Sequence, residues 1–237
     1  MAVFVICHGA WSAGWAWGKM RPLLRAAGHE MFTPSYTGLG ERAHLASPMV
    51  DLETHIQDVL GVIESEGLSD IILVGHSYGG MVATGVADRV ASKLRHLVYL
   101  DAFVPANGQS LDDLRGGETV ATIEGWLVPP MPPAPDTSAA DLAWTAPRRR
   151  AQPVRCFSQK SRLTGAVDHL PRTYIYCAKK GPSDVFVQFA DRFRNDNAWR
   201  YVEMQASHSP NVTAPDDLAW VAFAQFATPA PRCPTHT

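Results

Sequence analysis

The stretch Ile71-Ile72-Leu73-Val74-Gly75-His76-Ser77-Tyr78-Gly79-Gly80 decides the fold of this chain. Its four leading apolar residues have the pattern of a buried strand, and the small residues from Gly80 onward suit a helix. Gly75 and Gly79 allow neighbouring backbone to approach a sharp strand-to-helix turn closely. Such a turn places Ser77 at a helix N-terminus, where unpaired amides and the helix dipole favour developing negative charge. The pattern predicts that Ser77 is a nucleophile; an ordinary Gly-Ser turn before a helix is the alternative.

Short apolar runs alternate with helical patterns on both sides of this turn. We expect strands at 3–7, 29–33, 71–74, 97–100, 173–177 and 201–204, and helices at 17–27, 52–66, 82–90, 185–194 and 215–226. This alternation is typical of a parallel sheet, and near-continuous apolar strands fit a sheet that is covered on both faces. The sequence therefore predicts an α/β fold with a mostly parallel central sheet and helices on both faces.

One region interrupts the alternation. Between Pro105 and Pro171 the chain carries a proline-rich run at 128–135, which suits neither a helix interior nor a central strand. Long ordered insertions often act as lids, so we expect an inserted cap at 106–170 and a core domain formed by 1–105 and 171–237. A surface loop is the alternative. Within the cap we expect short helices near 138–144 and 152–163, and a solvated face at Arg148, Arg149 and Arg150.

Composition narrows the classes of function. With 237 residues, 46% of them hydrophobic, and a net charge of -2, the chain can bury one large core and carries no basic field for nucleic acid. It has no apolar run of about eighteen residues that could span a membrane, and it begins as a strand, so we expect a cytoplasmic location. The cysteines are far apart and are expected to be free thiols: Cys7, Cys156, Cys177 and Cys233. We expect a small-molecule substrate and no cofactor or metal; a homodimer is left open.

A serine nucleophile needs a base within hydrogen-bond reach and a third group that holds this base in the correct tautomer. His208 lies in the loop after the last expected strand and is our candidate base. For His76 we expect packing or a local hydrogen bond, and His44 could approach the site from a loop. The other histidines without sequence context are expected at the surface or at strand ends: His29, His55, His96, His169 and His236.

The loop after the first expected strand is a candidate oxyanion hole. It reads His8-Gly9-Ala10-Trp11-Ser12-Ala13-Gly14-Trp15, and backbone amides in such a loop can face a carbonyl oxygen as it gains charge. We expect the amides of Ala10 and Tyr78 to donate; a plain β-turn at His8-Gly9 is the alternative. An apolar substrate pocket is expected from five side chains, each of which could instead be core or lid packing: Trp11, Trp15, Trp126, Met131 and Trp144.

Together these segments resemble the α/β-hydrolase superfamily, and within it the small-lid branch of plant methylesterases, hydroxynitrile lyases and bacterial esterases. The resemblance covers most of the chain, although the cap matches only loosely. It is carried by His8-Gly9-Ala10, Gly14-Trp15, Trp17, the helix end 22–29, the turn 74–81 and Ser207-His208. The resemblance implies the α/β-hydrolase fold and the chain order serine, acid, histidine.

The acid departs from the pattern of this branch. Relatives usually carry it after the strand that corresponds to 173–177, where this chain reads Ala178-Lys179-Lys180-Gly181 and has no acid until Asp184. Other members of the superfamily carry it after the preceding strand, and Asp101 directly follows 97–100. We therefore assign Asp101 as the acid. Turn capping by Asp101, with Asp184 as the acid, is the alternative.

The resemblance implies a cofactor-independent serine hydrolase that cleaves a small, largely apolar ester, or a carbamate or lactone, through an acyl-enzyme. Hydroxynitrile lyases of this branch carry a threonine where Gly9 stands and a lysine where Ser209 stands, so these positions favour hydrolysis. Two alternatives remain open. One is a ligand-binding receptor built on the hydrolase fold, and the other is lyase or cofactor-free oxygenase chemistry in the same pocket.

Overall fold

The computed structural model describes residues 1–117, 121–134, 137–181, 184–223 and 226. Its central sheet consists of six strands: β1 (Val3–Cys7), β2 (Glu30–Phe32), β3 (Ile71–His76), β4 (Leu94–Leu100), β7 (Arg172–Cys177) and β8 (Trp199–Met204). Their spatial order is β2-β1-β3-β4-β7-β8, and every neighbouring pair is parallel. The prediction of a mostly parallel central sheet is confirmed.

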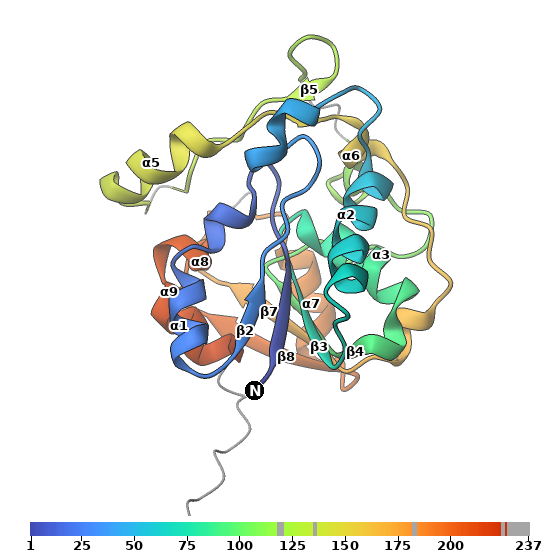
Figure 1. Ribbon diagram of the computed structural model, residues 1–237, viewed down its shortest axis with the longest axis vertical. Coiled ribbons are helices and arrows are strands. Elements are labelled where there is room, and N and C mark those ends of the chain that lie inside the picture. Colours follow the sequence, from blue (N-terminus) through green and yellow to red (C-terminus); the bar gives the residue numbers. More distant parts are fainter. Residues whose placement is uncertain (118–120, 135–136, 182–183, 224–225, 227–237) are drawn as a thin grey trace, which may run out of the picture.

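Helices cover both faces of this sheet (Figure 1). One buried apolar cluster includes residues of α2 (Leu52–Ser65), α3 (Gly79–Arg89) and α7 (Val187–Arg194). The other includes residues of the 3-10 helix η1 (Gly14–Trp17), α1 (Met20–Ala26) and α9 (Pro215–Leu218). Successive residues of a strand point to opposite faces, so Ile71 and Leu73 enter the first cluster while Ile72 and Val74 enter the second. This explains the unbroken apolar run of β3.

The helix boundaries follow local signals. Asp51 begins α2 because its side chain accepts a hydrogen bond from the amide of Thr54 at 3.0 Å. The expected helix at 17–27 is divided into η1 and α1, and Pro22 lies in the first turn of α1, where its missing N–H leaves no bond unmade. The expected helix at 215–226 is α helical only as α9 and continues as a π-type turn, η6 (Ala219–Phe223). Further short elements are η2 (Gly40–Leu45), η3 (Ala91–Lys93) and α8 (Pro210–Thr213).

Residues 106–170 form short elements, most of which lie near the end of the sheet where the strands finish, whereas the last of them packs beside the end of α3 (Figure 1). These are α4 (Leu111–Leu114), β5 (Leu127–Val128), α5 (Ala139–Thr145), η4 (Ala146–Arg148), β6 (Gln152–Pro153), α6 (Arg155–Ser158) and η5 (Ala166–His169). The helix expected near 138–144 is confirmed. The one expected over 152–163 is wrong for most of its length, because Gln152 and Pro153 pair with β5 and only four residues are helical. The division into core and cap stays a prediction.

Within the described ranges, no helix has the length and apolar content needed to cross a membrane. Three cysteines, Cys7, Cys156 and Cys177, are buried free thiols, as expected, and Cys233 lies outside the described residues.

Candidate active site

Ser77 lies on the turn between β3 and α3. Its φ is +55°, a left-handed conformation that side-chain-bearing residues rarely adopt. The start of α3 packs directly against neighbouring strand ends: a Cβ on Gly79 would lie 2.0 Å from the carbonyl oxygen of Cys7, and one on Gly80 would lie 2.1 Å from that of Phe103. Glycine is therefore required at both positions. The turn brings Ser77 to the wall of a cavity.

Ser77, His208 and Asp101 form a continuous hydrogen-bonded chain. Ser77 Oγ lies 3.0 Å from His208 Nε2, and His208 Nδ1 lies 2.6 Å from Asp101 Oδ2. Asp101 directly follows β4, and His208 lies in the loop after β8. A neutral imidazole that donates from Nδ1 to a carboxylate is free to accept the serine proton at Nε2. The structure thus brings together the three residues that the sequence singled out.

The carboxylate of Asp101 is fully buried and serves several donors. Besides His208, it is reached by Lys180 Nζ at 2.7 Å and by the backbone amide of Cys177 at 3.2 Å, both at Oδ1. Burial by itself raises the pKa of this carboxyl group, but the hydrogen bond from His208 and the charge of Lys180 outweigh it, so the pKa of Asp101 is lowered. Asp101 is therefore ionised at neutral pH.

Asp184, the alternative acid, serves a different purpose. Its Oδ1 accepts the amide of Phe186 at 2.9 Å, and its Oδ2 accepts the hydroxyl of Tyr176 at 2.7 Å. It also pairs with Lys180 at 2.9 Å. In the part of the chain that the structure describes, Asp184 forms no hydrogen bond with His208. The geometry therefore favours Asp101.

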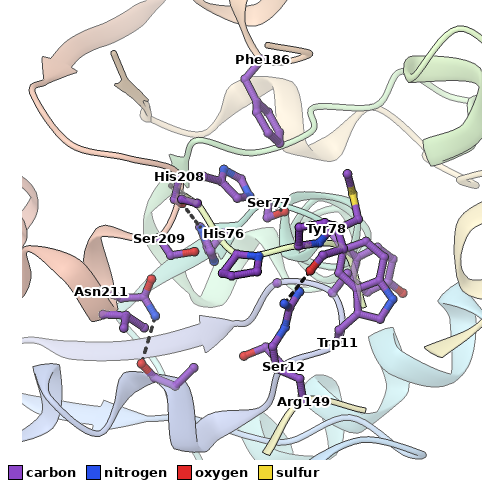
Figure 2. Close-up of a pocket in the computed structure, with 18 of the residues that line it drawn as sticks. Trp11, Ser12, His76, Ser77, Tyr78, Arg149, Phe186, His208, Ser209 and Asn211 are labelled. Atoms are coloured by element: carbon purple, nitrogen blue, oxygen red, sulfur yellow. Dashed lines mark hydrogen bonds between the residues drawn. The ribbon is translucent and has the colours of Figure 1, made fainter. Parts of the chain in front are cut away.

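Two neighbours, Phe186 and His76, contact His208 at its ring and at its backbone (Figure 2). Phe186 stacks on it with ring centroids 4.7 Å apart and planes 18° apart. His76 donates from Nε2 to the carbonyl oxygen of His208 at 2.7 Å. Burial lowers the pKa of His76 to about 3, so His76 stays neutral. This agrees with the local hydrogen bond expected for His76.

The loop after β1 lies on the other side of Ser77. His8 fixes it, because His8 Nδ1 donates to the carbonyl oxygen of Gly9 at 2.9 Å while Nε2 accepts the amide of Tyr36 at 3.3 Å. Burial lowers the pKa of His8 to about 3, which keeps this neutral arrangement. Among the described residues, the amides of Ala10 and Tyr78 have no hydrogen-bond acceptor. Both N–H groups are available to a ligand.

The buried side chain of His55 forms a hydrogen bond with the hydroxyl of Tyr78. The expectation that His55 lies at the surface or a strand end is wrong, since it is fully buried in α2. Its Nε2 donates to the carbonyl oxygen of Thr37 at 3.1 Å, and its Nδ1 accepts the hydroxyl of Tyr78 at 2.9 Å. Burial lowers the pKa of His55 to about 4. Both ring nitrogens are satisfied, which is what permits burial. His44, in contrast, is exposed and does not line the cavity.

A cavity of about 600 Å³ opens over Ser77. Much of its wall is apolar, with Trp11, Trp15, Phe103, Leu111, Met131, Phe157 and Phe186 among the lining residues. Of the five expected pocket residues, Trp11, Trp15 and Met131 line it, whereas Trp126 and Trp144 do not. Trp144 packs edge-on behind Trp15, with centroids 5.5 Å apart, and the carbonyl of Trp126 accepts the amide of Val154 within the cap.

Cationic side chains that the sequence did not single out as site residues also line the cavity. Arg149 was expected on a solvated face, and this is wrong: it is half-buried, lines the cavity and donates from Nη1 to the carbonyl oxygen of Met131 at 2.6 Å. Its guanidinium lies 5.9 Å from the ring centre of Trp11. Arg148 and Arg150 are exposed, as expected. Lys180 and Arg115 also line the cavity. No local pattern separates these residues from ordinary surface cations.

Within the described residues, no three His, Cys, Asp or Glu side chains lie together in a way that could hold a metal ion. The chemistry that this arrangement can support is proton transfer between Ser77 and His208, facing two free amides.

The chain is similar to several known proteins. Residues 4–219 match the model of the alpha/beta hydrolase family. A carbendazim hydrolyzing esterase from Nocardioides sp. (strain SG-4G) is 42% identical over 236 residues, which cover 92% of this chain and 97% of that protein. An alpha-hydroxynitrile lyase from Arabidopsis thaliana is 35% identical over 43% of this chain and 40% of its own length.

Among solved structures, an extracellular alpha/beta-hydrolase from a Paenibacillus species has a TM-score of 0.77 at 25% identity, covering 97% of this chain and all of that one (100%). It is described as sharing structural and functional homology with tobacco Salicylic Acid Binding Protein 2. A methylesterase of Arabidopsis has the same fold, with a TM-score of 0.74 at 23% identity, covering 96% of this chain and 98% of its own. The chain therefore belongs to the alpha/beta hydrolase family, in which it is an esterase related to plant methylesterases, a hydroxynitrile lyase and bacterial esterases.

Proposed function

We propose that this esterase hydrolyses small, largely apolar carboxylic esters and carbamates through an acyl-enzyme formed on Ser77. The observation that carries the proposal is the unbroken chain from Ser77 through His208 to Asp101 beside an aromatic cavity of about 600 Å³. The carbamate is included because the relative that is 42% identical is named for hydrolysing carbendazim, a carbamate.

In the first half of the reaction, Ser77 Oγ attacks the carbonyl carbon while His208 Nε2 takes the hydroxyl proton. Asp101 accepts from Nδ1 and stabilises the imidazolium that forms. The amides of Ala10 and Tyr78 donate to the carbonyl oxygen as it becomes an oxyanion, and each such donor contributes on the order of 3 kcal/mol. His208 then gives its proton to the departing alcohol as the bond between carbonyl carbon and leaving oxygen breaks.

In the second half, the same ring activates a water molecule. The water attacks the acyl carbon, its proton passes to His208 Nε2, and the bond to Ser77 Oγ breaks. Ser77 recovers its proton from His208, and the acid leaves. One histidine therefore acts as base and acid in both halves, which is why its hydrogen bonds to Ser77 and Asp101 must coexist.

Two positions favour hydrolysis over lyase chemistry. A Cβ on Gly9 would lie 3.1 Å from His76 Nδ1 and 3.3 Å from Ser77 Cβ, so a branched side chain there would crowd the nucleophile. Ser209 lines the cavity directly after His208 and brings no charge to a leaving group. Where the related lyases carry threonine, this chain has Gly9, which has no side chain. Where they carry lysine, it has Ser209, which is uncharged.

The test uses nitrophenyl esters and an O-methyl carbamate with the wild type and Ser77→Ala. We expect a burst of nitrophenol, a mass increase equal to one acyl group on Ser77, and loss of both turnover and adduct in Ser77→Ala. Ser65→Ala is the control, because Ser65 is exposed at the end of α2 and does not line the cavity. Tight ligand binding without turnover in the wild type would point to a receptor instead, and cleavage of a cyanohydrin in preference to esters would point to a lyase.

A further inference from the structure

We propose that Lys180 is a positioning residue for this reaction: it holds Asp101 as the partner of His208 and extends the activity to lower pH. The inference rests on the proposed roles of Ser77, His208 and Asp101. Lys180 touches none of the reacting atoms in the proposed mechanism and acts through Asp101.

The ammonium group of Lys180 is held from several sides. Its side chain is only 11% exposed, and Nζ lies 2.7 Å from Asp101 Oδ1 and 2.9 Å from Asp184 Oδ1. Nζ also lies 4.4 Å from the ring centre of Tyr176 and 4.8 Å from that of Phe186. A buried cation requires such partners, because the loss of hydration is otherwise uncompensated. Lys180 is therefore fixed in place rather than being a mobile surface lysine.

These contacts orient the carboxylate of Asp101. Lys180 and the amide of Cys177 both occupy Oδ1, so Oδ2 remains for His208 Nδ1. Rotation of the carboxylate would break the two bonds at Oδ1. The division of donors between its two oxygens thus aims Oδ2 at the imidazole and keeps the tautomer in which Nε2 can accept the proton of Ser77.

Lys180 also bears on the charge of His208. The two side chains share Asp101, and they share Phe186, whose ring stacks on His208 and faces the ammonium group. Protonation of His208 therefore places a second positive charge beside the same carboxylate. Like charges repel each other, so the ammonium group of Lys180 acts against a second positive charge on the ring of His208.

The other titratable groups that face this cluster carry no charge near neutral pH. Burial lowers the pKa of His76 to about 3 and raises the pKa of Tyr174, Tyr176 and Cys177. The charges that decide the behaviour of His208 are therefore those of Lys180, Asp101 and Asp184. Of these, Lys180 carries the positive charge, and it can be replaced without removing Asp101, the hydrogen-bond acceptor of His208 Nδ1.

The experiment measures the pH profile of kcat/KM for a neutral nitrophenyl ester. In Lys180→Met we expect kcat to fall at least tenfold with little change in KM, and the acidic limb of the profile to move to higher pH by roughly one unit. Lys180→Arg keeps the charge and should return the limb to its wild-type position. The control is Lys179→Met, the same substitution at an exposed neighbour that does not line the cavity; its profile should match the wild type.

An acidic limb that stays in place in Lys180→Met, or one that moves equally in Lys180→Arg, would overturn the inference and indicate a structural ion pair. If Lys180→Met does not fold by circular dichroism, Lys180→Gln keeps hydrogen-bond donors without the charge and should show the same shift. Ser77→Ala separates the two proposals. Loss of turnover in Ser77→Ala with an unmoved limb in the lysine variants refutes only the role of Lys180, whereas turnover that survives Ser77→Ala refutes the proposed function.

Discussion

Asp101→Asn tests the acid most sharply, because asparagine keeps the size of the side chain and removes its charge and one acceptor. Three donors point at this carboxylate: His208 Nδ1, Lys180 Nζ and the amide of Cys177. An amide has a single acceptor oxygen, so its NH2 group must replace one carboxylate oxygen. Two of the donors converge on Oδ1, at 2.7 and 3.2 Å, and we expect the amide oxygen to take that place. The NH2 group then faces His208.

In Asp101→Asn, His208 is held in the wrong tautomer. Its Nδ1 now faces the NH2 group of the asparagine and must accept a hydrogen bond, so the ring proton moves to Nε2. A protonated Nε2 can no longer take the proton of Ser77. Loss of the correct tautomer in a Ser-His-Asp arrangement lowers kcat by about 10⁴. We expect a loss of about 10³ to 10⁴ here, which corresponds to roughly 4 to 5.5 kcal/mol in the activation barrier.

The assay is steady-state hydrolysis of a nitrophenyl ester, with the fold of each variant checked by circular dichroism. KM should change little, because Asp101 is fully buried and does not line the cavity. Asp184→Asn is the comparison; it should stay within about tenfold of the wild type, since Asp184 forms no hydrogen bond with His208 within the described residues. An Asp101→Asn enzyme that keeps more than a tenth of its kcat, or a larger loss in Asp184→Asn, would refute the reasoning.

Two further predictions concern stability. Gly79→Ala should prevent folding, because the added Cβ would lie 2.0 Å from the carbonyl oxygen of Cys7; soluble protein with a native circular dichroism spectrum would contradict the packing of the turn. Stability should also fall as the pH decreases below about 6.5, since burial lowers the pKa of His8, His55 and His76 to about 3, 4 and 3. The unfolded chain binds more protons in this range, so each histidine lowers the free energy of unfolding by up to about 1.4 kcal/mol per pH unit. Urea unfolding from pH 7.5 to pH 5 measures this, and a constant midpoint would contradict it.

The element order and the nucleophile turn could be predicted because they depend on neighbours in the chain. The apolar run of β3, the small residues of α3 and the glycines between them lie within twenty residues of one another. His208 could be singled out because it lies in the loop after the last expected strand. Asp101 could be singled out because it directly follows β4 and because the resemblance to other superfamily members places an acid there. The strand ends of a parallel sheet meet at one edge, where these loops come together.

The sequence by itself therefore determined the parallel sheet and was enough to select Ser77, Asp101 and His208 as the candidate nucleophile, acid and base. Only the tertiary structure decided what surrounds them: Lys180 reaches Asp101 across 79 residues, His55 is buried beneath Tyr78, and Arg149 lies at the cavity while Trp126 and Trp144 do not. The physical reason is that such partners come from different elements. Their separation is set by strand register and by the packing of the segment 106–170, and neither hydrophobic period nor motif spacing carries that information.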